Sequence, residues 1–378
     1  MQTILVFSDW YYPGYKAGGP IQSSYNLSVL LSRHYRVRVV TRITDLNSSA
    51  PYPGIQPDTW VELGENHEAL YASPQRIKAS FIRQLIKENK DSIILINGLY
   101  SFYFSILPAY YSMLLKVNRV FISVRGMLHQ SALSVKPAKK RIFLSFAKGF
   151  GLYARATLLS TSPRETSEIR KILGNVSVKT APNIPLMPRA SYDESRLFRV
   201  GGKTRFLFLG RIAPEKNPVA VVDAFMQIAE PCQLTFCGSG LDRQYAAVFH
   251  EKLGKLPPHI EASYIEELPH DRIGDLLDNT DVMIMPSLGE NFGHAIFESF
   301  VHAVPVIIGN NTPWTGIEED KAGVEVDPKN TESITVAIRK FTTMHPVEYS
   351  AWRLGAFGLS KTYFEDNNFE DIYLRLFS

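Results

Sequence analysis

The sequence predicts an α/β protein built from two successive domains, each with a parallel sheet covered on both faces. Its length of 378 residues exceeds one ordinary core and suits two domains. Short apolar runs alternate with helical segments, which is typical of parallel sheets. This alternation stops at a stretch containing Pro182, Pro185 and Pro188 and then begins again, so we place a linker there.

The first domain is predicted to begin with a strand at residues 3–8, followed by a loop rich in glycine and proline. A helix is expected at 21–33, and a basic helix at 137–156. The other strands are expected at 36–41, 92–97, 119–124, 157–160 and 178–181. The polar run 190–196 completes the linker.

The second domain repeats the pattern. Its strands are expected at 205–209, 233–237, 259–264, 281–285 and 304–308, and its helices include 219–228, 270–277 and 292–301. A closing helix is expected at about 363–377. Ligands of open α/β sheets bind at the carboxyl ends of strands, so residues just after strands are the candidates for function.

Composition excludes wholesale disorder, because hydrophobic residues make up 45% and charged residues 21%. The net charge of +4 conceals an asymmetry. Residues 1–190 hold 24 Lys and Arg against 10 Asp and Glu, and the remainder holds 17 against 27. The basic half is therefore expected to meet something anionic: phosphates, nucleic acid or a membrane surface.

The two cysteines, Cys232 and Cys237, provide neither a disulfide framework nor a metal site, so a reducing compartment is expected. The apolar N-terminus has no basic n-region and no small-residue cleavage site, which indicates a first strand instead of a signal peptide. No stretch reaches the ~18 apolar residues of a spanning helix. These features predict a cytoplasmic protein.

The strongest functional signal is the stretch 287–307, SLGENFGHAIFESFVHAVPVI. Glu290 precedes a predicted helix that Asn291, Phe292 and Gly293 open, and Glu298 follows about two turns into it. Amides at a helix start can hold phosphate or sugar oxygens. Two carboxylates at this spacing are usually solvated surface, but the apolar surroundings and the glycines favour a binding site.

Two further loops follow predicted strands. In FLFLGRIAPEKNP (206–218), Arg211 offers a planar fork and Lys216 a point charge, a plausible diphosphate clamp or an ordinary surface turn. Gly18 and Gly19 follow the first strand, where glycine lets the backbone approach a phosphate or simply makes a turn. Neither G-x-G-x-x-G nor a P-loop pattern is present there.

These motifs, in this order, resemble glycosyltransferase family 4, retaining enzymes of the GT-B fold. The resemblance runs from the Gly-Gly loop to the closing helix, and its most specific element is E-x7-E (Glu290 and Glu298) followed by PVI. It implies that 1–187 binds the acceptor, that 200–360 binds the nucleotide-sugar donor, and that 361–378 is a helix crossing back to the first domain. The two domains would face a central cleft.

The resemblance also implies the roles of the motif residues. Glu298 would bind the ribose hydroxyls and Glu290 the donor sugar, while Arg211 and Lys216 would grip the diphosphate and offset its charge. Backbone amides of Phe292 and Gly293, with Asn291, Gly18 and Gly19, would complete the phosphate cradle. Arg211 and Lys216 would supply the positive charge that a metal ion supplies in other enzymes, so no metal site and no cofactor are predicted.

One departure from the family pattern concerns a histidine that many members carry after the strand at 119–124. Here Arg125 stands nearest that position and His129 follows four residues later, so both remain candidates. No pair of carboxylates suits a double displacement, and front-face transfer is implied by analogy.

The basic segment 136–156 mixes six Lys and Arg with aromatic and aliphatic residues. It could be a helix on an anionic membrane surface or an ordinary helix with its apolar stripe in the core. The first alternative implies a peripheral protein on the inner face of the membrane.

The sequence therefore predicts a metal-independent, retaining glycosyltransferase acting in polysaccharide biosynthesis. Its donor would be a nucleoside-diphosphate sugar. A UDP-sugar is favoured over a GDP-sugar because UDP-sugars are the commonest donors in the family. Its acceptor would be a glycan or a polyprenyl-diphosphate-linked molecule. The alternatives are a nucleotide-sugar epimerase of the same fold and a non-enzymatic nucleic-acid-binding protein. The acidic C-terminal half and the absence of a nucleic-acid motif argue against the latter.

Overall fold

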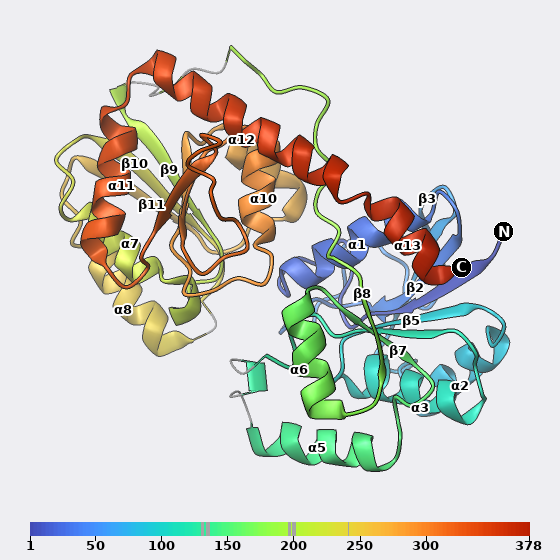
Figure 1. The fold of residues 1–378 in the computed structure, drawn as a ribbon. Helices are drawn as coiled ribbons and strands as arrows, with labels where there is room; N and C mark the ends of the chain where they lie inside the picture. The colour runs from blue at the N-terminus through green and yellow to red at the C-terminus, as the bar shows by residue number, and fades with distance from the viewer. Residues whose placement is uncertain (130–131, 134–136, 196–197, 199–201, 241) are drawn as a thin grey trace. The chain divides into compact units, whose positions relative to one another are not determined.

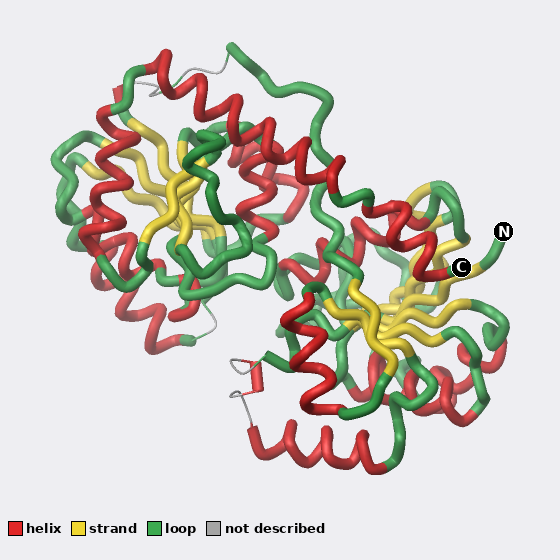
Figure 2. Tube along the Cα trace, in the orientation of Figure 1, coloured by secondary structure: helices red, strands yellow, loops and turns green. Residues whose placement is uncertain are grey.

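The chain divides into two compact units (Figure 1). The computed structural model describes residues 1–129, 132–133, 137–195, 198, 202–240 and 242–378. Unit 1 comprises Met1–Ile184 and Asn368–Ser378, and unit 2 comprises Pro185–Asn367. Each unit contains one sheet, and Figure 2 shows helices on both sides of each sheet. The predicted α/β class with two Rossmann-like domains is confirmed.

Unit 1 contains an eight-stranded sheet in the order β3-β4-β2-β1-β5-β6-β7-β8. Its strands are β1 (Thr3–Phe7), β2 (Arg36–Arg42), β3 (Trp60–Gly64), β4 (His67–Ala72), β5 (Ile93–Asn97), β6 (Val120–Ser123), β7 (Thr157–Ser160) and β8 (Ser177–Thr180). All pairs are parallel except β3 with β4. The sequence pattern did not predict this antiparallel edge, because β3 has only five residues and none of them is fully buried.

Helices of unit 1 cover the sheet. They are α1 (Gly19–Leu31), α2 (Ala79–Glu88), the π-helical turn η1 (Phe102–Ile106), α3 (Leu107–Leu114), α5 (Pro137–Gly149), α6 (Pro163–Leu173) and α13 (Phe369–Phe377). Helix α5 ends at Gly149, earlier than the predicted 156, because the chain turns at Gly151 with φ 63°. Of the predicted basic segment, Lys136 lies outside the described residues.

Unit 2 contains a six-stranded, fully parallel sheet in the order β11-β10-β9-β12-β13-β14. Its strands are β9 (Thr204–Leu209), β10 (Cys232–Cys237), β11 (Ile260–Ile265), β12 (Val282–Met285), β13 (Val306–Gly309) and β14 (Gly323–Val326). Its helices and 3₁₀ turns are η3 (Pro214–Lys216), α7 (Pro218–Phe225), α8 (Arg243–Leu253), η4 (His270–Arg272), α9 (Ile273–Asp278), α10 (His294–Val301), α11 (Thr331–Thr343) and α12 (Pro346–Asp366).

The closing segment forms two helices where the sequence suggested one. Helix α12 ends at Asp366 and α13 begins at Phe369, because Asn368 adopts a left-handed conformation with φ 39°. Asparagine tolerates this conformation better than most residues. Helix α13 packs within unit 1, where Phe377 is fully buried and its ring centroid lies 4.9 Å from that of Phe121. None of the described helices combines the length and the apolar character that crossing a bilayer requires.

Candidate functional site

The strand order of each sheet identifies one point where ligands are expected. In unit 2 the chain runs outward from β9 to β10 and β11, and then continues on the other side of β9 with β12, β13 and β14. The loops after β9 and β12 therefore diverge at a topological switch point. The loop after β9 carries Arg211 and Lys216, and the loop after β12 carries Glu290.

Lys216 and Glu290 are brought together at this switch point. Lys216 Nζ pairs with Glu290 Oε1, which also accepts a 2.7 Å hydrogen bond from Ser287 Oγ. The two paired side chains keep only 18% and 10% of their surface exposed. Pairing and hydrogen bonding offset the cost of holding both charges away from water.

Backbone contacts hold the two loops against each other. Leu288 N donates to Glu215 O at 2.9 Å, which joins the loop after β12 to the loop after β9. Asn217, in the left-handed conformation with φ 62°, lies between Lys216 and the start of α7 at Pro218. Its side-chain amide donates to Pro328 O at 2.7 Å. The positions of the paired charges are thus fixed by the backbone.

Arg211 does not join that pair. Its guanidinium binds Glu215 Oε1 at 2.9 Å within the same loop, and both side chains are half exposed. Arg211 thus pairs with Glu215, while Lys216 pairs with Glu290.

Glu298 lies in the second turn of α10 and is only 5% exposed. Its Oε1 atom lies 3.2 Å from His270 Nε2. Burial lowers the pKa of His270, but the hydrogen bond and the charge of Glu298, with Asp271, raise it, and the net direction is upward. His270 could not be predicted as a site residue from the sequence, because a single histidine in a polar turn carries no motif.

The start of α10 is shaped by Phe292 and Gly293. Gly293 has φ 80°, and a Cβ there would lie 2.7 Å from Ile296 Cδ1, so glycine fits on both counts. The Phe292 ring is buried, and its carbonyl accepts a 2.6 Å hydrogen bond from Trp314 Nε1. Asn291, in contrast, is exposed at the loop tip.

In unit 1 the switch point lies between β1 and β5. The loop after β1 ends at Gly18, whose φ of 70° precedes the start of α1 at Gly19. Asp45 holds this loop, because its Oδ2 atom accepts from Tyr15 N at 2.8 Å and from Lys16 N at 3.1 Å. The glycine pair therefore occupies a constrained turn at a helix start.

Arg125 and His129 have different surroundings in unit 1. The Arg125 guanidinium donates to Asn97 Oδ1 at 3.2 Å, and Asn97 in turn donates to Ser24 Oγ in α1 at 2.8 Å. His129 Nδ1 instead pairs with Glu168 on α6. Arg125 is thus connected to the helix that follows the glycine pair.

The backbone next to Arg125 is held by a buried carboxylate that no sequence motif indicates. Glu165 is fully buried and accepts from Gly126 N at 2.5 Å and Thr161 N at 2.6 Å. Arg125 itself has φ 51°, a conformation that costs energy for a residue with a side chain. Burial lowers the pKa of its guanidinium from the ordinary value.

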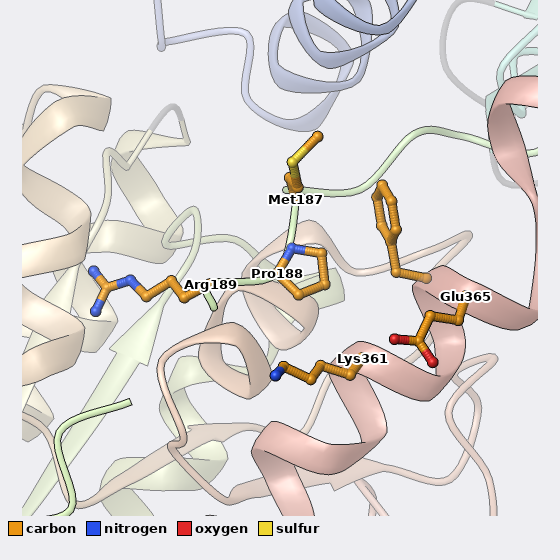
Figure 3. A pocket seen from close by; sticks show the side chains of 6 residues that line it. Met187, Pro188, Arg189, Lys361 and Glu365 are labelled. Atoms are coloured by element: carbon orange, nitrogen blue, oxygen red, sulfur yellow. The ribbon is translucent and has the colours of Figure 1, made fainter. Parts of the chain in front are cut away.

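A cavity of about 180 Å³ lies in unit 2 and contains none of the predicted site residues (Figure 3). Met187, Pro188 and Arg189 line it from the linker, and Lys361, Phe364 and Glu365 line it from α12. It is smaller than typical ligand pockets of ~300–1,000 Å³. Arg189 is bound to Asp278 at 3.1 Å, so it serves to attach the linker.

Comparison with protein families places a match on unit 2. Residues 193–350 match the family described as glycosyl transferases group 1. A 2-deoxystreptamine N-acetyl-D-glucosaminyltransferase from Niallia circulans is 26% identical over 153 residues, which is 39% of each chain. A glycosyltransferase from Methanocaldococcus jannaschii is 28% identical over 131 residues, 34% of this chain and 33% of that one. The matched segments thus span between 33% and 39% of the length of these relatives.

Solved structures resemble the chain over its whole length. Sucrose-phosphate synthase from Thermosynechococcus elongatus matches with a TM-score of 0.70 at 17% identity. The match covers 100% of this chain and 97% of the synthase chain. Anabaena HepE in complex with UDP and glucose has a TM-score of 0.70 at 14% identity, with 99% of each chain covered. These likenesses show the GT-B fold, and the family match to glycosyl transferases group 1 is confined to residues 193–350.

Proposed function

We propose that the chain is a retaining glycosyltransferase that moves a sugar from a nucleoside-diphosphate sugar to a glycan or lipid-linked acceptor in polysaccharide biosynthesis. The observation that carries this proposal is the arrangement of Lys216, Glu290 and Glu298 in loops and helices that follow strands of unit 2. All three lie inside the segment that matches glycosyl transferases group 1. UDP is the favoured nucleotide, because Anabaena HepE, which is similar in structure, forms complexes with UDP and with UDP-glucose.

In this proposal the donor's diphosphate binds beside Lys216. The ammonium group supplies positive charge that matters most when the diphosphate departs, so it stabilises the transition state more than the bound donor. Arg211 adds a second cation when its ion pair with Glu215 separates. That pair is exposed, so its separation costs little free energy. With two cations in place, the proposed reaction needs no metal ion.

The two carboxylates accept hydrogen bonds from hydroxyl groups of the donor. Glu298 binds the ribose, and His270 holds its carboxylate in position. Glu290 binds the transferred sugar and is oriented by Ser287. Asn291 and the amides of Phe292 and Gly293 are assigned to the phosphates, since a helix start favours anions.

In unit 1 the proposal assigns phosphate contacts to Gly18 and Gly19, which open α1. Arg125 is preferred to His129 as the residue that contacts the donor, because Asn97 and Ser24 connect Arg125 to α1. The acceptor is assigned to unit 1.

The experiment is a calorimetric titration with UDP-, GDP- and ADP-sugars, followed by assays with and without small glycan acceptors. The expected result is binding of one nucleotide class and acceptor-dependent release of nucleoside diphosphate, with the anomeric configuration retained by NMR. Isomerisation of the donor without an acceptor would establish the epimerase alternative. Binding of oligonucleotides but of no nucleotide sugar would overturn the proposal.

A further inference from the structure

Helix α5 and the turn after it expose a row of large apolar side chains. Ile142, Phe146 and Phe150 are 71%, 59% and 66% exposed. Their spacing of four residues places Ile142 and Phe146 on one face of the helix, and the rings of Phe146 and Phe150 stack with centroids 4.4 Å apart. The opposite face buries Leu144 and Ala147. The sequence could not distinguish these two stripes, because both are apolar.

An exposed apolar row of this kind indicates a binding surface. A soluble protein rarely leaves several large apolar side chains together in water. Figure 1 shows α5 at the edge of unit 1. The helix thus has one face in the core and one apolar face that the described residues of unit 1 leave exposed.

Basic residues flank the row. Lys139 and Arg141 are exposed on α5, and neither forms an ion pair within the described part of the chain. No acidic residue occurs between Asp91 and Glu165. Lys140 differs, because its Nζ atom donates to Ala132 O at 2.6 Å and lies 5.2 Å from the Tyr100 ring centroid. Lys140 therefore serves packing, while its neighbours face solvent.

We propose that the α5 surface, formed by Lys139, Arg141, Ile142, Phe146 and Phe150, docks the protein on an anionic lipid bilayer. The apolar side chains enter the boundary between headgroups and acyl chains, and the two cations contact the anionic headgroups. A second copy of the chain is the poorer partner, since a two-fold contact would bring like charges together. This proposal goes beyond the transferase activity and does not depend on it.

The two kinds of side chain give binding two components. The ionic component weakens when salt rises from about 0.1 M to about 1 M, because the Debye length falls from about 10 to about 3 Å. The apolar component persists in salt. Loss of the cations and loss of the apolar row are therefore distinguishable.

The test is co-sedimentation of the full chain with phosphatidylcholine vesicles that either contain or lack phosphatidylglycerol. The wild type is expected to bind only the anionic vesicles. The triple variant I142S/F146S/F150S and the double variant K139S/R141S are each expected to bind at least tenfold more weakly. The double variant should also lose most of the salt dependence of binding.

Matched controls lie in unit 2. V347S/L354S removes two exposed apolar side chains from α12, and R243S/K329S removes two exposed cations, so that net charge changes as in K139S/R141S. Both controls should bind like the wild type. Thermal melts verify folding, and nucleotide affinity in all variants should equal that of the wild type.

Three results would overturn the proposal. The wild type could fail to bind anionic vesicles, or the controls could lose as much binding as the α5 variants. Sedimentation velocity could instead reveal a dimer that the α5 variants dissociate, which would assign the surface to a second copy. None of these results bears on transferase activity, so failure of this proposal is distinguishable from failure of the proposed function.

Discussion

The Nζ atom of Lys216 and the Oε1 atom of Glu290 form an ion pair between residues 74 positions apart in the sequence. One residue follows β9 and the other follows β12, and these two strands are neighbours in the sheet. A bound diphosphate would offer Lys216 a second anion beside Glu290. The pair is therefore the first target for mutation.

Replacing Lys216 with alanine should reduce turnover more than it reduces donor affinity. The ammonium group acts mainly on charge that develops as the diphosphate departs, so a loss of roughly 10²- to 10³-fold in kcat is expected. Steady-state kinetics and calorimetric donor titration measure the two effects. Lys252→Ala is the control, because Lys252 pairs with Asp223 at 2.6 Å on other helices of unit 2. Normal turnover with only a raised KM would show that Lys216 binds without catalysing.

Replacing Glu298 with alanine should weaken nucleotide binding. Loss of a charge-assisted contact to the ribose is expected to cost roughly 1.5–3 kcal/mol, or about ten- to a hundredfold in affinity. Calorimetry with the free nucleoside diphosphate isolates this contact from those to the sugar. Glu332→Ala, on the exposed start of α11, is the control. Unchanged nucleotide affinity in the Glu298 variant would refute the assignment.

The His270–Glu298 pair should make stability depend on pH. Because the folded-state pKa of His270 is raised, the pair stabilises fully below the unfolded value of about 6.5 and loses its effect as pH rises through the folded-state pKa. Below pH 6.5 the free energy of unfolding of the wild type should exceed that of H270Q by roughly 1–2 kcal/mol. This difference should shrink at alkaline pH. Urea denaturation across this range measures it, with H250Q on α8 as the control. A difference that does not vary with pH would exclude the pair as its source.

Two glycines of α12 should respond oppositely to alanine. A Cβ at Gly355 would lie 2.0 Å from Asp320 O, whereas a Cβ at Gly358 would meet nothing within 4 Å. G355A should therefore cost about 1–3 kcal/mol through the clash. G358A should raise the free energy of unfolding by about 0.5–1 kcal/mol, because alanine favours the helix. Thermal or urea denaturation of this pair tests the packing of α12, and equal effects of the two substitutions would contradict it.

Most central strands could be predicted from the sequence, because runs such as Ile93–Asn97 and Val282–Met285 are short, apolar and buried on both faces. The edge hairpin of β3 and β4 could not, since its pairing partner and not its pattern makes β3 a strand. Among site residues, Lys216 and Glu290 were each predicted from local motifs. Their ion pair was not, because it depends on strand order in the sheet.

Some positions carried no local signal. His270 is defined by its contact with Glu298 on another element, and Glu165 by the amides that it accepts from Gly126 and Thr161. The break at Asn368 divides a segment whose composition favours one helix. In each case tertiary contacts or a single backbone conformation decide the outcome.

The return of Asn368–Ser378 to unit 1 has a consequence for biosynthesis. Unit 1 emerges from the ribosome before unit 2, yet the buried ring of Phe377 reaches its core only after all of unit 2 has been translated. During elongation unit 1 therefore exposes the apolar surface that α13 later covers. All of unit 2 has been translated before α13, so unit 2 is complete before unit 1. A nascent chain of this protein should need protection by chaperones longest at the domain that is made earliest.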